Sequence, residues 1–191
     1  MDSHAAPSIL DRETESSTAP PPRCVVVAGA TGGIGAAFCE SVADRFPDAR
    51  IIRLARRLES LPSIASATLD IGFDITDEKA IEDAVGRIDD ASVDWVFVAT
   101  GWLHGDKRRP EKTFKQLDAT NLTHAYLINA IGPSLLVKHL FAKLVTDRAA
   151  HLGILSARVG SISDNRLGGW HAYRASKAAL NMLIKNFALE W

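Results

Sequence analysis

The sequence lacks the features that mark several classes of protein. Among its 191 residues, 22 basic and 23 acidic side chains give a formal net charge of −1, so no excess charge favours nucleic acid or an anionic membrane as a partner. Two cysteines, Cys24 and Cys39, are too few for a disulfide framework, and we expect both to be small core residues. The sequence has no continuous run of about 18 apolar residues, so it predicts no membrane-spanning helix. We therefore expect a cytoplasmic protein that acts on small molecules.

The first 22 residues differ in composition from the rest of the chain. They are rich in proline, hydroxyl and acidic residues and show no apolar periodicity, which predicts a disordered tail. They also lack the apolar centre of a secretory signal and the basic, acid-poor composition of a transit peptide. We expect this tail to precede a single domain over residues 23–191.

Short apolar runs alternate with helical patterns along that domain. The spacing predicts helices between the runs, with Thr76 capping the second helix, a long helical region at about 112–147 and a last helix from about 172. Parallel strands need crossovers of this length. The prediction is an α/β fold with a doubly wound parallel sheet of the Rossmann type, with strands at residues 24–28, 50–55, 67–74, 93–99 and 151–157.

A glycine-rich turn, "VVVAGATGGIGAAF", joins the first strand to the first helix. Glycines at such a turn let backbone N–H groups approach a pyrophosphate, and the helix N-terminus adds a partial positive charge. The turn therefore predicts a dinucleotide site built from Gly29, Thr31, Gly33, Ile34 and Gly35.

The end of the second strand indicates which dinucleotide is bound. An NAD site usually has an acidic residue there for the ribose 2′-hydroxyl, whereas this chain reads "RLARR". Arg56 or Arg57 suits a 2′-phosphate instead, although the cluster also fits a solvated strand end. The sequence favours NADP, with NAD the less favoured cofactor.

Tyr173 and Lys177 lie four residues apart in "GWHAYRASKAAL". This spacing places both side chains on one helix face. A tyrosine titrates near pH 10, too high for efficient proton transfer at neutral pH. A lysine ammonium beside it stabilises the phenolate, so we expect Lys177 to lower the pKa of Tyr173.

The glycine spacing G-x-x-x-G-x-G, followed by Y-x-x-x-K, resembles the short-chain dehydrogenase/reductase family over Cys24 to Trp191. The loop before Tyr173 looks most like sniffer- and C-factor-like carbonyl reductases. The resemblance implies an NAD(P)-dependent oxidoreductase that interconverts a ketone or aldehyde with its alcohol and forms a homodimer. Tyr173 would be the acid/base catalyst, Lys177 would also hold the nicotinamide ribose, and the chemistry needs no metal.

Asn129 matches the asparagine that this family uses in a proton relay. Pro133, four residues on, has no N–H for the Asn129 carbonyl, and its ring crowds that carbonyl, so the helix should kink there. A carbonyl released in this way can bind water. The alternative is an ordinary helical asparagine followed by a helix break.

The remaining family positions match unevenly. The resemblance implies adenine contacts from Asp74 and Ile75 and cofactor contacts from Thr100 and Gly101, although the usual asparagine pair before that glycine is missing. The family's substrate-binding serine falls at Ala157. We favour Ser156 for that role, with Ser161 as the alternative.

Two features of the sequence leave a second function open. The family continues beyond its Tyr/Lys helix, whereas this chain ends at Trp191 within a helical pattern, so we expect a C-terminally truncated sequence. The displaced serine and the missing asparagines also fit a dinucleotide-binding signalling or regulatory protein without turnover. Trp102 and Trp170 flank the expected pocket mouth and are candidates to line it.

Overall fold

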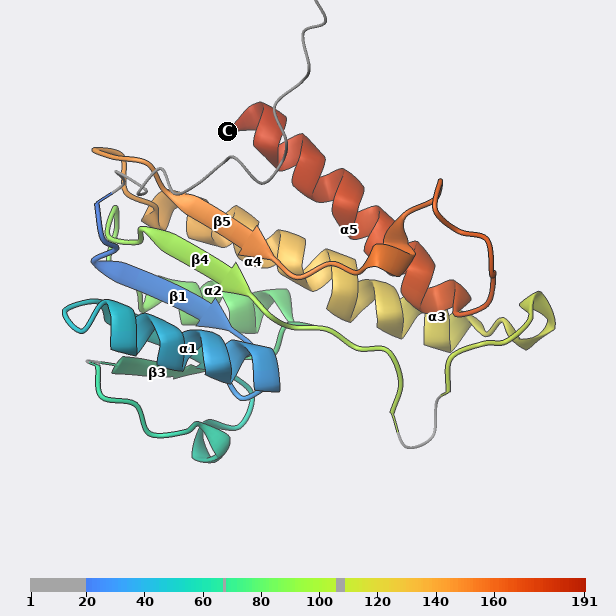
Figure 1. Ribbon diagram of the computed structural model, residues 1–191, viewed down its shortest axis with the longest axis horizontal. Coiled ribbons are helices and arrows are strands. Elements are labelled where there is room, and N and C mark those ends of the chain that lie inside the picture. Colours follow the sequence, from blue (N-terminus) through green and yellow to red (C-terminus); the bar gives the residue numbers. More distant parts are fainter. Residues whose placement is uncertain (1–19, 67, 106–108) are drawn as a thin grey trace, which may run out of the picture.

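A computed structural model describes residues 20–66, 68–105 and 109–191. Most of the expected N-terminal tail, residues 1–19, lies outside this range. The described chain forms one five-stranded sheet in the order β3-β2-β1-β4-β5, and every strand pair is parallel (Figure 1). The strands are β1 (Cys24–Ala28), β2 (Arg50–Ala55), β3 (Thr68–Gly72), β4 (Trp95–Val98) and β5 (His151–Ile154).

Helices cover both faces of this sheet, which confirms the doubly wound α/β prediction. The strand order reverses at β1, whose neighbours are β2 and β4. Ligands of open α/β sheets bind beyond the carboxyl ends of the strands at such a reversal. The main helices are α1 (Gly33–Arg45), α2 (Glu78–Gly86), α3 (Ala119–Tyr126), α4 (Gly132–Leu140) and α5 (His171–Glu190).

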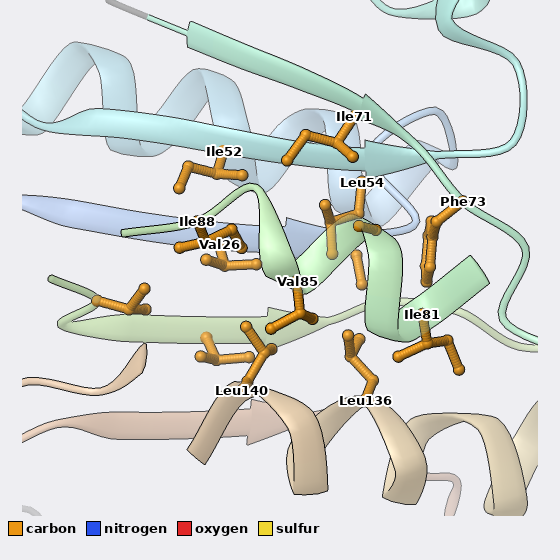
Figure 2. Packing of buried hydrophobic residues seen from close by; sticks show 14 of the residues in the cluster. Val26, Ile52, Leu54, Ile71, Phe73, Ile81, Val85, Ile88, Leu136 and Leu140 are labelled. Carbon is orange, nitrogen blue, oxygen red and sulfur yellow. The ribbon is translucent and has the colours of Figure 1, made fainter. Parts of the chain in front are cut away.

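The larger core cluster lies between the sheet and the pair α2 and α4 (Figure 2). Val26, Ile52 and Ile71 come from three adjacent strands and meet Ile81 of α2 and Leu136 of α4. All five are fully buried. This close-packed contact fixes β1, β2 and β3 against α2 and α4.

The opposite face of the sheet packs against α1. Val25, Val27 and Ile51 face this helix, which contributes the buried Cys39. Cys24 is buried in the other cluster, so both cysteines are core residues as predicted. Burial raises the pKa of each thiol to about 11, which keeps both unreactive near neutral pH.

The segment Ala119–Lys143 is one continuous helical run that changes type in its middle. A π-helical turn, η4 (Leu127–Ile131), separates α3 from α4, and the Gly132 N–H donates to the Leu127 carbonyl. Where the sequence predicts a kink from Pro133, the structure has this π-helical turn, with Pro133 in the first turn of α4. Such turns are frequent at functional sites.

This same helical run is long and apolar enough, by those two criteria alone, to cross a membrane; its mean hydropathy reaches 1.2. It contacts α2 and α5 and contributes Leu136 and Leu140 to the core. Packing against the protein itself therefore explains why the segment is apolar, and it is a core helix.

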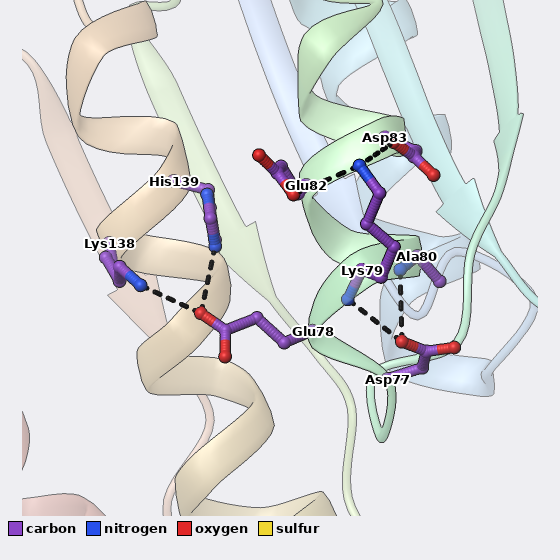
Figure 3. A network of polar contacts seen from close by, with 8 residues as sticks. All are labelled: Asp77, Glu78, Lys79, Ala80, Glu82, Asp83, Lys138 and His139. Atoms are coloured by element: carbon purple, nitrogen blue, oxygen red, sulfur yellow. Dashed lines mark hydrogen bonds and ion pairs between the residues drawn. The ribbon is translucent and has the colours of Figure 1, made fainter.

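Polar contacts at the start of α2 fasten it to its surroundings (Figure 3). Asp77, and not the predicted Thr76, is the N-cap: its side chain accepts from the Lys79 and Ala80 N–H groups. Thr76 is instead bound to the Asp74 carboxylate. Lys138 of α4 donates to Glu78 over 2.8 Å, which ties α4 to α2 at the surface.

Candidate active site

The glycine turn has a geometry that only glycine can provide at two positions. Gly29 adopts a φ of 82°, in the left-handed region, and its N–H donates to Leu54 of β2 over 2.9 Å. A Cβ at Gly35 would lie 2.3 Å from the Gly29 carbonyl oxygen. A Cβ at Gly33, in contrast, would meet nothing within 4 Å. Packing within the protein thus requires glycine at Gly29 and Gly35, whereas a side chain at Gly33 would point into open space at the N-terminus of α1.

A cavity of about 250 Å³ opens beside this turn at the carboxyl ends of β1 and β4. It also reaches the ends of β2 and β3, as expected at the reversal of strand order. Ile34 is exposed and Gly35 is buried at the start of α1, beside the cavity and outside its lining. Seven of the predicted cofactor-binding residues line it: Gly29, Thr31, Arg56, Asp74, Ile75, Thr100 and Gly101.

The arginines of "RLARR" divide into two groups. Arg53 is buried and bound to both carboxylate oxygens of Asp70 at 2.7 Å, so it is structural. Arg56 and Arg57 line the cavity. The pKa of Asp74 is lowered chiefly by the Thr76 backbone N–H, then by the Thr76 hydroxyl and the positive charge of Arg56. An ionised acceptor and a cation therefore share this end of the cavity.

The hydroxyl of Thr100 is a buried polar atom without a partner. Thr100 lines the cavity and follows the end of β4. A buried hydroxyl without a hydrogen bond is costly, and a ribose hydroxyl or an amide of a bound nucleotide would satisfy it. Because Gly29 and Thr31 of the glycine turn line the same cavity, this hydroxyl makes the cavity suitable for a dinucleotide.

Lys177 lies at the Gly101 end of this cavity. Its side chain is buried, and Nζ donates to the Leu155 carbonyl over 2.8 Å. A Cβ at Gly101 would lie 3.8 Å from Lys177 Nζ. Burial lowers the pKa of Lys177, because a low-dielectric environment disfavours the ammonium form.

Tyr173 and Lys177 lie on one side of α5, as predicted: Lys177 Nζ is 6.0 Å from the centroid of the Tyr173 ring. The expected lowering of the Tyr173 pKa is wrong for this structure, in which burial raises it. The cause of the rise is desolvation of the phenol, and the Lys177 ammonium is bound to the Leu155 carbonyl. The pair is assembled, but its electrostatics differ from the expectation.

Asn129 sits in the π-helical turn and is completely buried. Its Oδ1 accepts from the Trp102 N–H over 2.7 Å, and its Nδ2 donates to the Trp102 carbonyl over 2.8 Å. Nδ2 also donates to Ser176 of α5 over 3.0 Å. The side chain therefore joins the segment after β4 to the Tyr/Lys helix, and the predicted water-binding role concerns its backbone carbonyl.

Neither candidate serine is bound to Tyr173. Ser156 is exposed, and its hydroxyl donates to Asn181 Oδ1 over 2.5 Å, one helical turn beyond Lys177. Ser161 contacts Ser163 and accepts from the Asp164 N–H. It lines a different cavity, on the flank of α5 that carries Arg174. The substrate-oxygen donor stays a prediction.

The two tryptophans take separate positions. Trp102 lines the cofactor cavity and packs edge to face against His124, with ring centroids 4.7 Å apart. Trp170 precedes α5 and contacts the Tyr173 ring, with centroids 6.4 Å apart and an angle of 74° between the planes. Aromatic surface therefore borders both the nucleotide cavity and the phenol.

Two residues that hold this site together, Ser176 and Glu111, are absent from the predicted site residues. The Ser176 hydroxyl, fully buried, donates to the Tyr173 carbonyl over 2.9 Å and accepts from Asn129. Glu111, also buried, binds the first turn of α5. Ser176 gave a usable signal, as a small polar residue on the Tyr/Lys face of the helix, whereas Glu111 lies in a loop with no motif around it.

Comparison with known proteins gives matches over most of the chain. The family model for short chain dehydrogenases matches residues 23–191. A dehydrogenase from Rhodococcus sp. strain AD45, which acts on 1-hydroxy-2-glutathionyl-2-methyl-3-butene, is 31% identical over 85% of this chain and 69% of its own length. An uncharacterized oxidoreductase from Schizosaccharomyces pombe is 25% identical over 86% of this chain and 66% of its own. This chain thus spans about two thirds of these relatives.

Solved structures give the same fold. A Burkholderia multivorans protein with bound NADP, described as a short-chain dehydrogenase/reductase, matches with a TM-score of 0.76 and 25% identity. The match covers 89% of this chain and 74% of that one. The Sniffer protein of Caenorhabditis elegans, described as a carbonyl reductase, matches with a TM-score of 0.76 and 23% identity, over 90% and 79% of the two chains.

Proposed function

This chain belongs to the short-chain dehydrogenase/reductase family, and from that premise we propose that it reduces a ketone or aldehyde to an alcohol with NADPH. The observation that carries the proposal is the position of one face of α5. This face carries Tyr173 with its ring centroid 6.0 Å from Lys177 Nζ, and Lys177 Nζ lies near Gly101, which lines the cavity suited to a dinucleotide. We also propose that the chain forms a homodimer, as the family implies, and that it acts in the cytoplasm.

When bound, the nicotinamide would supply a hydride to the carbonyl carbon. Tyr173 donates its phenolic proton to the carbonyl oxygen, so that one C–H and one O–H bond form and the carbonyl becomes an alcohol. An ammonium on Lys177, with Nζ 6.0 Å from the centroid of the phenol ring, would oppose the rise that burial causes in the Tyr173 pKa and so help the phenolate that remains. In the oxidative direction the phenolate accepts the proton from the alcohol.

The preference for NADPH is supported by charge at the end of β2. Arg56 lines the cavity, and no acidic side chain occupies that strand end. An arginine pairs well with a phosphate group. The NADP-bound Burkholderia relative is consistent with this choice.

A second candidate function is dinucleotide binding without turnover. The hydroxyl of Ser156 is directed to Asn181, and Ala157 occupies the family's serine position. Without an oxyanion donor near the phenol, turnover would fall by about 10²-fold or more. This alternative predicts tight NADPH binding with no reduction of any carbonyl.

The test is Tyr173→Phe, which removes only the phenolic oxygen. NADPH oxidation is followed with benzaldehyde, acetophenone and cyclohexanone, and NADPH binding is followed by fluorescence titration. We expect kcat to fall about 10²- to 10⁴-fold, the usual contribution of a general acid, while the Kd for NADPH stays unchanged.

Tyr126→Phe is the matched control, because Tyr126 in α3 is the chain's other tyrosine. Equal activity of Tyr173→Phe and wild type would reject the acid/base role. Tight NADPH binding by the wild type, with no turnover on any of the three carbonyls, would favour the non-catalytic alternative.

A further inference from the structure

The catalytic helix begins without a cap of its own. Its N-cap residue is Trp170, which makes no side-chain cap hydrogen bond, and the first turn has no acidic residue. The first backbone N–H groups of a helix need partners from outside it. The chain also enters α5 through three successive residues with left-handed φ values, Gly168 (62°), Gly169 (66°) and Trp170 (51°). For a bulky residue such as Trp170 this conformation costs about 1–2 kcal/mol.

Glu111, from the segment after β4, provides what this helix lacks. Its Oε2 accepts from the Ala172 N–H over 3.2 Å, and its backbone carbonyl accepts from the Trp170 N–H over 2.5 Å. Its Oε1 accepts from the side-chain amide of Asn121 in α3. Glu111 is only 3% exposed. One residue thus joins three segments at the start of α5.

The buried charge of Glu111 is placed where it is tolerated. Glutamates are almost never fully buried unless their charge is compensated. Here the carboxylate lies against the N-terminus of a 20-residue helix, whose partial positive charge stabilises an anion. The two side-chain hydrogen bonds are both received from neutral amide groups, so the helix end and these donors together hold the carboxylate.

We propose that Glu111 is the positioning residue for the Tyr/Lys helix: its carboxylate fixes the first turn of α5 and thereby the place of the Tyr173 phenol. Tyr173 directly follows Ala172, whose N–H the carboxylate binds, and its ring contacts Trp170, whose N–H the Glu111 carbonyl binds. A shift of about 1 Å in a catalytic group can cost about 10²-fold in rate. This inference rests on the proposed function of Tyr173.

Two substitutions separate this role from a general effect on folding. Glu111→Ala removes both side-chain bonds and leaves the backbone bond to Trp170 in place. Glu111→Gln keeps an oxygen for the Ala172 N–H, and its amide can donate to Asn121 Oδ1, which has no partner in the structure, once the Asn121 amide rotates. Glutamine should therefore restore the position of the helix. Glu40→Ala is the matched control, as an exposed glutamate on α1.

The experiment measures kcat and KM with benzaldehyde and the Kd for NADPH in the full chain. It also measures hydrogen exchange in peptides covering residues 168–176 and 33–45. For Glu111→Ala we expect a 10- to 100-fold loss in kcat, an unchanged Kd for NADPH, and faster exchange at 168–176 only. Glu111→Gln should stay within about threefold of wild type in kcat and exchange as wild type does.

Wild-type kcat and wild-type exchange in Glu111→Ala would overturn the proposal, as would equal losses in Glu111→Ala and Glu111→Gln. Faster exchange of both peptides would show a folding defect and would overturn it too. Should the wild type itself reduce no carbonyl, the proposed function fails. The exchange of residues 168–176 still reports whether Glu111 fixes the helix.

Discussion

The proposed active site has two halves, a nucleotide half at the glycine turn after β1 and a catalytic half at Tyr173 and Lys177 of α5, which are held in place by different means. The nucleotide half is built from a short stretch of backbone: Gly29 and Gly35 shape a turn that packs on the end of β2. The catalytic half depends on contacts between residues far apart in the chain. Asn129 reaches Ser176 across 47 residues, and Glu111 reaches Ala172 across 61.

The difference in construction brings a difference in energetic cost. The glycine turn needs no buried charge, and its fit follows from steric limits. The catalytic half buries the ammonium of Lys177, the carboxylate of Glu111 and the amide of Asn129, each of which needs hydrogen bonds to be tolerated. The nucleotide half is therefore expected to tolerate few changes of shape, and the catalytic half few changes of polarity.

The largest expected effect comes from adding one methyl group to the glycine turn. Gly35→Ala would place Cβ 2.3 Å from the Gly29 carbonyl oxygen, and we expect a loss of about 3 kcal/mol in the free energy of unfolding. Gly33→Ala is the matched variant, since its Cβ meets no protein atom within 4 Å. We expect it to retain wild-type stability and to lose about 10-fold or more in NADPH affinity.

Thermal denaturation and NADPH titration of both variants check this pair. A destabilised Gly33→Ala, or a stable Gly35→Ala, would contradict the division between glycines required by packing and a glycine required by the ligand. Loss of affinity in Gly33→Ala without loss of stability would sharpen it.

This difference also explains how much of the protein could be predicted from its sequence. The alternation of strands and helices, the glycine turn and the Tyr173–Lys177 spacing can be predicted, because each is written in residues close together in the chain. The parallel sheet then follows from the length of the connections between its strands. A disturbance of the helix near Asn129 could be predicted from Pro133, but its form as a π-helical turn could not. The role of Glu111 could not be predicted, since nothing near it in sequence indicates a helix 61 residues away.

The prediction for the Tyr173 pKa was wrong for a related reason. Helical spacing places Lys177 beside the phenol, and the structure confirms that placement. The rise in the Tyr173 pKa comes from burial of the phenol, and the Lys177 ammonium is bound to Leu155, which follows β5. Burial and tertiary partners are not visible in the spacing of a motif.

Lys177→Met tests whether the catalytic half is sensitive to a change of polarity. Its expected effect on stability is smaller than that of Gly35→Ala. Burial lowers the pKa of Lys177, so folding disfavours its charged form, and the ammonium reduces stability at pH values below its folded-state pKa. Methionine removes the desolvation cost of the buried ammonium but leaves the Leu155 carbonyl without its donor, so we expect a net gain of about 1 kcal/mol at pH 7. Carbonyl reduction should fall by about 10²-fold or more, since the ribose and phenolate contacts are lost.

The stability difference between Lys177→Met and wild type has a predicted pH dependence. As the pH rises through the folded-state pKa towards 10.5, the native lysine loses its proton before the unfolded one does, and the wild type recovers stability. The gain from methionine should therefore shrink over this range. Chemical denaturation at pH 7 and at pH 10 measures it, and a constant gain would contradict the desolvation account.

The smallest effect is expected at Arg56, on the exposed rim of the nucleotide half. The pKa of Asp74 is lowered chiefly by the Thr76 backbone N–H, and the guanidinium of Arg56, which lines the same cavity, adds a smaller lowering. The charge of Arg56 therefore acts at the place where a 2′-phosphate would bind. Because Arg56 is exposed, we expect Arg56→Ala to weaken NADPH binding by only about 10-fold and to leave NADH binding unchanged.

Arg45→Ala is the control, as an exposed arginine in the last turn of α1. Titration of both dinucleotides at low and at high salt provides the measurement. Equal losses for NADPH and NADH would mean that Arg56 acts on a feature the two share, and the preference would then have to arise from Arg57 or from outside this cavity.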